Sequence, residues 1–254
     1  MSGQSKGTVY AHAYFSASVE RTLQADNFGD IFAGLTSVAL TAFMVESYIN
    51  YLCEKICDYE SRANLFLDDN NHLEIDKKLK ELPKNDLSLN VNLAENLGYK
   101  NQTEKMIKSL TSSLRKSNRE NFQIDFNEGM SFYELEKKYK LSTKNKLKAL
   151  LKASNTEPAK RDKFLQQFTQ LFNARNALAH GRTENVSESF TKELTSDISK
   201  SVPTVTASWQ ESCSIEKARE MYSSSKELVS YFNEEFLKEF SPLINLSSQI
   251  SVVS

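Results

Sequence analysis

Two long segments repeat apolar residues at spacings of three and four, and this period constrains the fold more than any other feature of the chain. One segment runs from Asp30 to Asp58 and the other from Pro158 to Ala179. Such spacing places the apolar residues in a stripe along one face of an α-helix. Each stripe must be buried against another element, so we expect the two helices to pack together in an all-α helical bundle. The stripes consist of Phe32, Leu35, Ala39, Phe43, Ile49, Cys53 and Ile56, and of Phe164, Leu165, Phe168, Leu171, Phe172 and Leu178.

Weaker signals predict the rest of the fold. Further helices are expected at 11–24, 73–82, 103–116, 131–140, 143–152 and 214–240. Ser131 and Glu134 have the spacing of a capping box. Alternating apolar residues suggest short strands at 122–126 and 204–209, too few for a large sheet, and 85–101 shows no period. We therefore expect one domain over residues 1–254. It has core helices at about 30–58 and 158–180, a basic helical and partly irregular insertion at about 100–155, and a C-terminal helix at about 214–240.

The cysteines and the apolar segments indicate a soluble protein of a reducing compartment. The chain has three cysteines, and Cys53 and Cys57 lie one turn apart on an apolar helix, which is typical of reduced core thiols. The alternative, a metal site, would need both thiols and two ligands from Cys213, His12, His72 and His180, in no standard zinc spacing. The first residues lack a secretory core. The segment from Ile31 to Ile56 is interrupted by polar residues, so we expect a cytoplasmic protein without a membrane span.

Charge is distributed unevenly along the chain. From Lys100 to Lys163 there are 16 Lys and Arg against 8 Asp and Glu, although the formal net charge of the whole chain is only −1. This basic block could attract a polyanion such as RNA. Lysine-rich helices are also common solvated surfaces, so that second interpretation stands beside the first. With only 7 glycines and no glycine-rich phosphate loop, the sequence predicts no nucleotide cofactor.

Arg175 and His180 form the most informative motif, at the end of the second long helix. A histidine moves protons near neutral pH, and a guanidinium holds phosphate through two hydrogen bonds while keeping its charge. The pair therefore suits cleavage of a phosphodiester. The alternative is structural, because a histidine at a helix end can cap the last carbonyl groups. Arg175 continues the apolar stripe, so its charge must be paired there or face a ligand.

Two features concern how this motif could be completed. Positions five apart differ by about 140° around a regular helix, so Arg175 and His180 converge only if the last turn loosens before Gly181 or if a second copy of the chain completes the site. Glu46 falls in the stripe of the first long helix, where a carboxylate needs a partner. Either Glu46 pairs with Arg175 or it reaches water.

The sequence from Phe172 to Gly181 and the helix around Glu46 resemble the HEPN superfamily, whose ribonuclease members carry an arginine, four residues and a histidine. The resemblance covers about a third of the chain. It implies a metal-independent endoribonuclease in which Arg175 and His180 are catalytic and Asn176 and Glu46 support them. It also implies a homodimer with a shared site, and a role as a toxin or antiviral defence effector with a protein inhibitor or antitoxin as a partner. The alternative is a catalytically silent HEPN-like module that binds RNA, a nucleotide or a protein. Residues after His180 lack the tyrosine of the branch that partners nucleotidyltransferases.

The segment from Arg182 to Ser212 follows the motif directly and is rich in Ser, Thr and Glu. Long connections of this kind include lids over binding sites as well as plain surface loops. Both interpretations stay open from the sequence.

Overall fold

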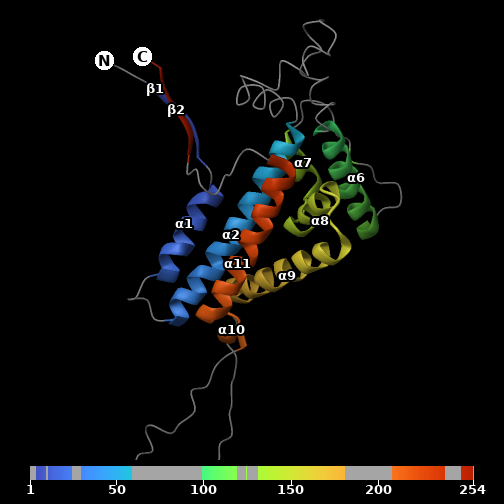
Figure 1. Cartoon of the computed structure of the whole chain (residues 1–254). Helices are drawn as coiled ribbons and strands as arrows, with labels where there is room; N and C mark the ends of the chain where they lie inside the picture. The colour runs from blue at the N-terminus through green and yellow to red at the C-terminus, as the bar shows by residue number, and fades with distance from the viewer. Residues whose placement is uncertain are drawn as a thin grey trace, which may run out of the picture. The chain divides into compact units, whose positions relative to one another are not determined.

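The computed structural model describes residues 4–9, 11–24, 30–58, 99–118, 124, 131–180, 208–237 and 247–253. They form two compact units. Unit 1 comprises Met1–Val45, Gln166–Val229 and Ser241–Ser254, and unit 2 comprises Glu46–Leu165 and Ser230–Phe240. Three long helices, α2 (Asp30–Cys57), α9 (Pro158–His180) and α11 (Ile215–Phe232), contribute residues to both units (Figure 1).

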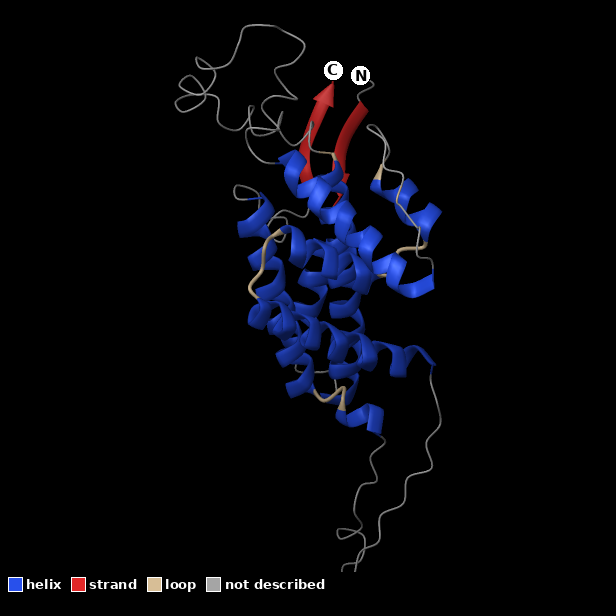
Figure 2. Ribbon diagram, turned by 90° about the vertical axis from the view of Figure 1, so that its right-hand side faces the viewer, coloured by secondary structure: helices blue, strands red, loops and turns tan. Residues whose placement is uncertain are grey.

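Unit 1 joins parts of these three helices to α1 (Ala11–Gln24) and the short α10 (Ser208–Glu211). Its strands β1 (Gln4–Val9) and β2 (Ser247–Val253) pair antiparallel, with Gln4 opposite Val253 and Val9 opposite Ser247. Figure 2 shows this strand pair in red and the helices, which make up most of the described residues, in blue.

Three contacts join α1, α2 and α11, with the turn before it, in unit 1. The hydroxyl groups of Ser16 and Tyr222 lie 2.8 Å apart, and the rings of Phe15 and Phe43 are in contact with centroids 5.8 Å apart. Gly34 lies against the turn that precedes α11, where a Cβ atom would overlap the carbonyl oxygen of Cys213. The absence of a side chain at this position therefore allows the backbone of α2 to approach that turn.

Unit 2 packs the end of α2 against α6 (Tyr99–Asn118), α7 (Phe132–Tyr139) and α8 (Thr143–Ala153). Thr103 of α6 donates to the carbonyl oxygen of Ile56. The capping box of α7 forms in full, with the Ser131 side chain accepting from the Glu134 backbone and the Glu134 carboxylate accepting from the Ser131 backbone. A short π-helix, η2 (Asn233–Leu237), follows α11, and its Asn233 accepts from the Tyr48 hydroxyl at 2.8 Å.

The all-α helical bundle is confirmed, and several predicted boundaries agree with the structure within two residues. These are the limits of α1, α2, α7, α8 and α9. The predicted helix at 73–82 and the strand at 122–126 lie outside the described residues, apart from the buried Ile124, which is in neither a helix nor a strand. The limits of a single domain stay a prediction.

Three expectations were wrong. Residues 99–101 belong to α6 and are not irregular, and residues 208 and 209 of the predicted strand at 204–209 belong to the helix α10, whereas residues 204–207 lie outside the described part of the chain. The strand pair β1–β2 had no alternating signal strong enough to be predicted. In α2 the predicted stripe is buried at Ile49, Cys53 and Ile56. Toward its N-terminus, however, Phe32 and Phe43 are 61% and 44% exposed, because the buried face is formed by neighbouring residues such as Ala33, Val38 and Ala42.

Helix α2 is long and apolar enough to cross a membrane by length and composition, with a mean hydropathy of 1.4 in an 18-residue window of Ile31–Cys57. Half of that window is buried inside the protein. Two of its polar side chains are bonded within unit 2: Asn50 accepts from Lys146, and Glu54 accepts from the Tyr133 backbone at 3.1 Å. These contacts are those of a core helix and are compatible with a soluble protein.

The burial of His12 makes stability depend on pH. The side chain is only 1% exposed, and removal from water lowers the pKa of His12 to about 4. In the unfolded chain the pKa is about 6.5, so between these values the unfolded state binds a proton that the folded state does not. Stability therefore falls as the pH drops through this window. We expect the wild type to lose about 2 kcal/mol more than His12→Gln between pH 7.5 and pH 5, measured by chemical denaturation. Equal losses in the two proteins would contradict this role of His12.

Candidate functional site

Helix α9 carries the Arg175–His180 motif at its C-terminal end. The helix begins at Pro158 and remains regular through His180. Positions 175 and 180 are therefore about 140° apart around its axis. The loosened last turn that could bring Arg175 and His180 to one face of the helix is therefore not observed in α9.

Arg175 is half-buried and is held by two neighbours on its own helix. The centre of its guanidinium group lies 5.0 Å from the centroid of the Phe172 ring, a cation–π contact. Its Nη1 atom donates a hydrogen bond to Oδ1 of Asn176 at 3.0 Å. Phe172 in turn stacks on Phe168, with ring centroids 4.1 Å apart. The stacked ring of Phe172 and the amide of Asn176 therefore orient the guanidinium group.

Asn176 is exposed and accepts a hydrogen bond from Arg175. The resemblance implied only that it supports Arg175 and His180. The observed hydrogen bond gives it a defined contact, since the amide oxygen orients the guanidinium of its neighbour. Phe172, which the sequence placed only in the core stripe, contributes to the same arrangement.

Glu46 is half-buried on α2 and accepts a hydrogen bond from Thr143 Oγ1 at 2.8 Å. Both residues belong to unit 2, whereas Arg175 belongs to unit 1. Thr143 is the first residue of α8, so Glu46 links α2 to the beginning of that helix. The Glu46–Arg175 pair stays a prediction.

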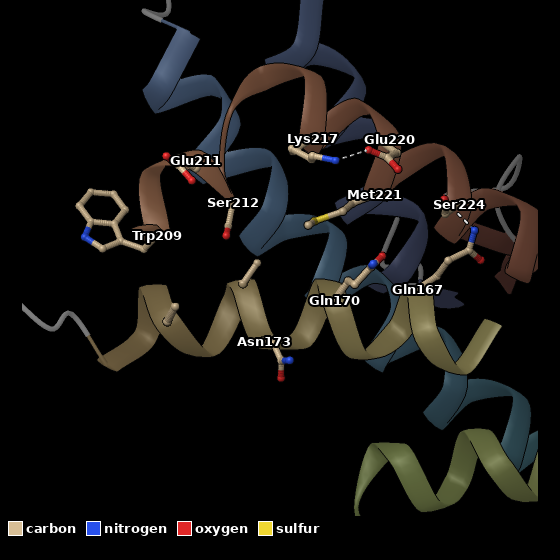
Figure 3. A pocket seen from close by; sticks show the side chains of 12 residues that line it. Gln167, Gln170, Asn173, Trp209, Glu211, Ser212, Lys217, Glu220, Met221 and Ser224 are labelled. Carbon is tan, nitrogen blue, oxygen red and sulfur yellow. Dashed lines mark hydrogen bonds and ion pairs between the residues drawn. The ribbon is translucent and has the colours of Figure 1, made fainter. Parts of the chain in front are cut away.

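A cavity lies beside the motif, within unit 1, between α9 and the segment that contains α10 and the start of α11 (Figure 3). Its volume is about 560 Å³. Gln167, Gln170, Ala174 and Ala177 line it from α9. The opposite wall is lined by Trp209, Glu211, Ser212, Lys217, Glu220, Met221 and Ser224. The end of the segment that the sequence suggested as a lid or a loop, residues 209–212, thus lines a cavity; residues 182–207 lie outside the described part of the chain.

The charged side chains of the cavity wall, which are Lys217, Glu211 and Glu220, carry a net charge of −1. Lys217 forms an ion pair with Glu220 at 3.0 Å, and both side chains are exposed at the edge. The thiol of Cys213, which follows Ser212, is buried, and burial raises its pKa. The thiol therefore stays protonated near neutral pH and is unsuited to act as a nucleophile.

Unit 2 presents lysine side chains to solvent on α7 and α8. Lys144, Lys148 and Lys152 recur every four residues on α8 and are all exposed, and Lys137, Lys138 and Lys140 are exposed as well. Lys146 departs from the expected basic surface. It is 1% exposed and donates to Glu136 at 2.6 Å and to Asn50 at 2.5 Å, so it is a core residue of this unit.

The cysteines are buried and free, as the sequence predicted. Burial raises the pKa of Cys53 and of Cys57 well above the usual range of a thiol. Among the described residues, no group of three or more His, Cys, Asp or Glu side chains gathers in a way that could hold a metal ion. His72, one of the ligands considered from the sequence, lies outside the described residues.

Sequence reasoning missed the cavity, although two signals pointed to it. Gln167 and Gln170 interrupt the apolar pattern of α9 at a spacing of three, which places two amides on one side of the helix. Trp209 is the single tryptophan of the chain. Neither signal shows which segments meet, because Gln167 and its partner Ser224 are 57 positions apart.

Comparison with known proteins adds no family to this description, since no protein-family model, no curated protein and no solved structure matches the chain.

Proposed function

We propose that this protein is a metal-independent endoribonuclease of the HEPN type. The observation that supports the proposal most is the arrangement of Arg175, which is held by Phe172 and Asn176 five positions before His180 at the end of α9. A cation fixed in direction at a half-buried position is suited to holding a phosphate group. The exposed lysines of α7 and α8 provide a surface for the RNA backbone.

The proposed reaction is attack of a ribose 2′-hydroxyl on the adjacent phosphorus. The oxygen–phosphorus bond to the next nucleotide breaks, leaving a 2′,3′-cyclic phosphate and a 5′-hydroxyl. His180 transfers the proton between the attacking and leaving oxygens. Arg175 holds the phosphate and stabilises the charge that develops on its oxygens, and Asn176 orients Arg175. Glu46 supports the site in this proposal by pairing with Arg175.

A homodimer completes the site in this proposal. Because positions 175 and 180 differ by about 140° on a regular helix, two copies of α9 bring an arginine and a histidine to each half of a shared cleft. Phe32 and Phe43 are eleven positions apart and therefore lie on the same side of α2, where they remain exposed. Such a side offers apolar surface to a second copy.

The biological setting follows from the resemblance alone. We place the protein in the cytoplasm, as a toxin or antiviral defence effector that a protein inhibitor or antitoxin restrains. The second candidate function is a catalytically silent module that binds RNA, a nucleotide or a protein. The cavity beside the motif would serve that function without any cleavage.

Cleavage in the presence of excess chelator tests the proposal. Purified protein is incubated with end-labelled single-stranded RNA in EDTA, and the products are treated with a phosphatase that removes terminal monophosphates but leaves cyclic phosphates intact. We expect cleavage with cyclic phosphate and 5′-hydroxyl ends. Cleavage that requires an added divalent metal, or that leaves a 5′-phosphate, would overturn the proposed chemistry. Binding of the RNA without cleavage would favour the silent module.

A further inference from the structure

The cavity between α9 and the α10–α11 segment has the size and lining of a site for a small molecule. Its volume of about 560 Å³ falls within the range of ligand pockets, roughly 300–1,000 Å³. All residues that line it belong to unit 1. The side chains combine amides and hydroxyl groups with an aromatic ring and a thioether, so the site can offer both hydrogen bonds and a flat apolar surface.

Gln167 gives the first indication of a ligand. Its Nε2 atom donates to Ser224 Oγ at 3.1 Å, as the dashed line in Figure 3 shows. The other polar atom of this amide, Oε1, is buried and has no hydrogen-bond partner among the residues that the structure describes. A buried acceptor of this kind is costly unless a partner satisfies it. Since a serine hydroxyl both donates and accepts, rotating the amide would still leave one of its polar atoms for a ligand.

The opposite end of the cavity is formed by Trp209 of α10, which is half-buried. Figure 3 shows its ring at that end, with Met221 of α11 between the two ends. An indole ring and a thioether are suited to contact with the face of a flat heterocycle. Ala174 and Ala177 add only methyl groups from α9, so this wall leaves room for such a ring.

The charges favour a neutral ring over a phosphate in the cavity. The cation of the wall, Lys217, is paired with Glu220, and Glu211 adds a negative charge. A phosphate would instead be drawn to Arg175, which follows Ala174 directly on α9. Ala177 is three positions before His180 on a regular helix, so the two positions lie on neighbouring sides within one turn. A ligand that extends past Ala177 would therefore have its remaining atoms near position 180 of the motif.

We propose that this cavity binds one nucleobase of a single-stranded RNA and so selects the nucleotide next to the bond that is cut. The base lies against Met221 and donates an N–H group to the free amide oxygen of Gln167, and the nucleotide extends along α9 toward Trp209, whose fluorescence responds to its binding. The choice of RNA as the source of the base rests on the proposed function. The binding of a base does not, because it needs no cleavage.

Fluorescence of the chain's single tryptophan tests this site directly. The full-length protein is titrated in EDTA with each of the four nucleoside 5′-monophosphates, and with ribose 5-phosphate as a control that lacks a base. We expect a saturable change of Trp209 fluorescence with at least one nucleotide, at least tenfold discrimination among the bases, and no change with ribose 5-phosphate. An equal response to ribose 5-phosphate, or no saturable response to any nucleotide, would overturn the proposal.

Neighbouring glutamines of α9 provide matched variants. Gln167→Leu should weaken binding of the preferred nucleotide at least tenfold, and Gln170→Leu should weaken it too. Gln166→Leu changes an exposed residue outside the cavity lining and should leave binding unchanged. Gln170 is exposed, so its substitution tests the site even if Gln167→Leu does not fold. Unchanged affinity in Gln170→Leu together with unchanged affinity in a folded Gln167→Leu would contradict the assignment.

The two proposals fail separately. Nucleotide binding without chelator-resistant cleavage would support the base site and overturn the ribonuclease. Cleavage with no nucleotide response at Trp209 would leave the ribonuclease standing and overturn the base site.

Discussion

Replacing Arg175 with alanine should lower the rate of RNA cleavage by about 10³-fold, and His180→Ala should have an effect of the same order. In the proposed mechanism the guanidinium holds the phosphate and stabilises its oxygens as the bond breaks, so Arg175→Ala loses that charge. The imidazole transfers the proton in the same mechanism, so His180→Ala loses that group. The measurement is the single-turnover rate on labelled RNA in excess EDTA, with thermal melting of each variant recorded in parallel. We expect melting temperatures close to that of the wild type, because position 175 is only half-buried.

A matched substitution on the same helix controls for changes in α9 itself. Arg161 is also an arginine of α9, and its Nε atom lies 3.7 Å from Asp162, away from the motif in sequence. Arg161→Ala should retain full activity. Activity that persists in both Arg175→Ala and His180→Ala would remove the two residues from any catalytic role.

Mixing the two inactive variants separates the dimer from a monomeric site. If each half of a shared cleft takes its arginine from one protomer and its histidine from the other, mixed dimers of Arg175→Ala and His180→Ala retain one intact half. We then expect partial recovery of activity on mixing. A strict monomer by light scattering that is fully active would reject the shared cleft.

Local signals predicted the helices well, because each acts over a few residues. Pro158 begins α9 and the Ser131–Glu134 capping box begins α7, as their spacing indicated. The face that each helix buries was harder to predict. In α2, Phe32 and Phe43 satisfy the apolar period yet remain exposed, since smaller residues such as Ala33 and Ala42 form the close contacts of that helix.

Only those parts of the candidate site whose residues are neighbours in the sequence could be predicted. The motif of Arg175 and His180 is contiguous, and Asn176 was singled out with it, so sequence alone found these residues. The cavity depends on which segments meet: Gln167 and Ser224 are joined only by the fold. No local pattern contains that information.

The buried lysine of unit 2 shows a signal that was present but was interpreted as surface charge. Lys146 precedes Ala149, Leu150 and Ala153 by three, four and seven positions, and all of these residues are buried. Lys144, Lys148 and Lys152 occupy other sides of α8 and are exposed. Counting the charge of the whole block concealed this difference, whereas the helical period separates the two kinds of lysine.

Lys146→Ala should reduce the free energy of unfolding by about 3 kcal/mol, the lower end of the range for breaking a buried ion pair. The substitution removes the partner of the Glu136 carboxylate and the donor to the Asn50 amide. Lys146→Met should be milder, because it loses the ammonium group and its two hydrogen bonds but retains most of the apolar stem. Lys148→Ala, an exposed lysine on the same helix, should change stability by less than about 0.5 kcal/mol. Chemical denaturation of the four proteins measures these differences. If Lys146→Ala proved as stable as Lys148→Ala, the Lys146–Glu136–Asn50 cluster would contribute nothing measurable to the stability of the fold, although its lysine is buried.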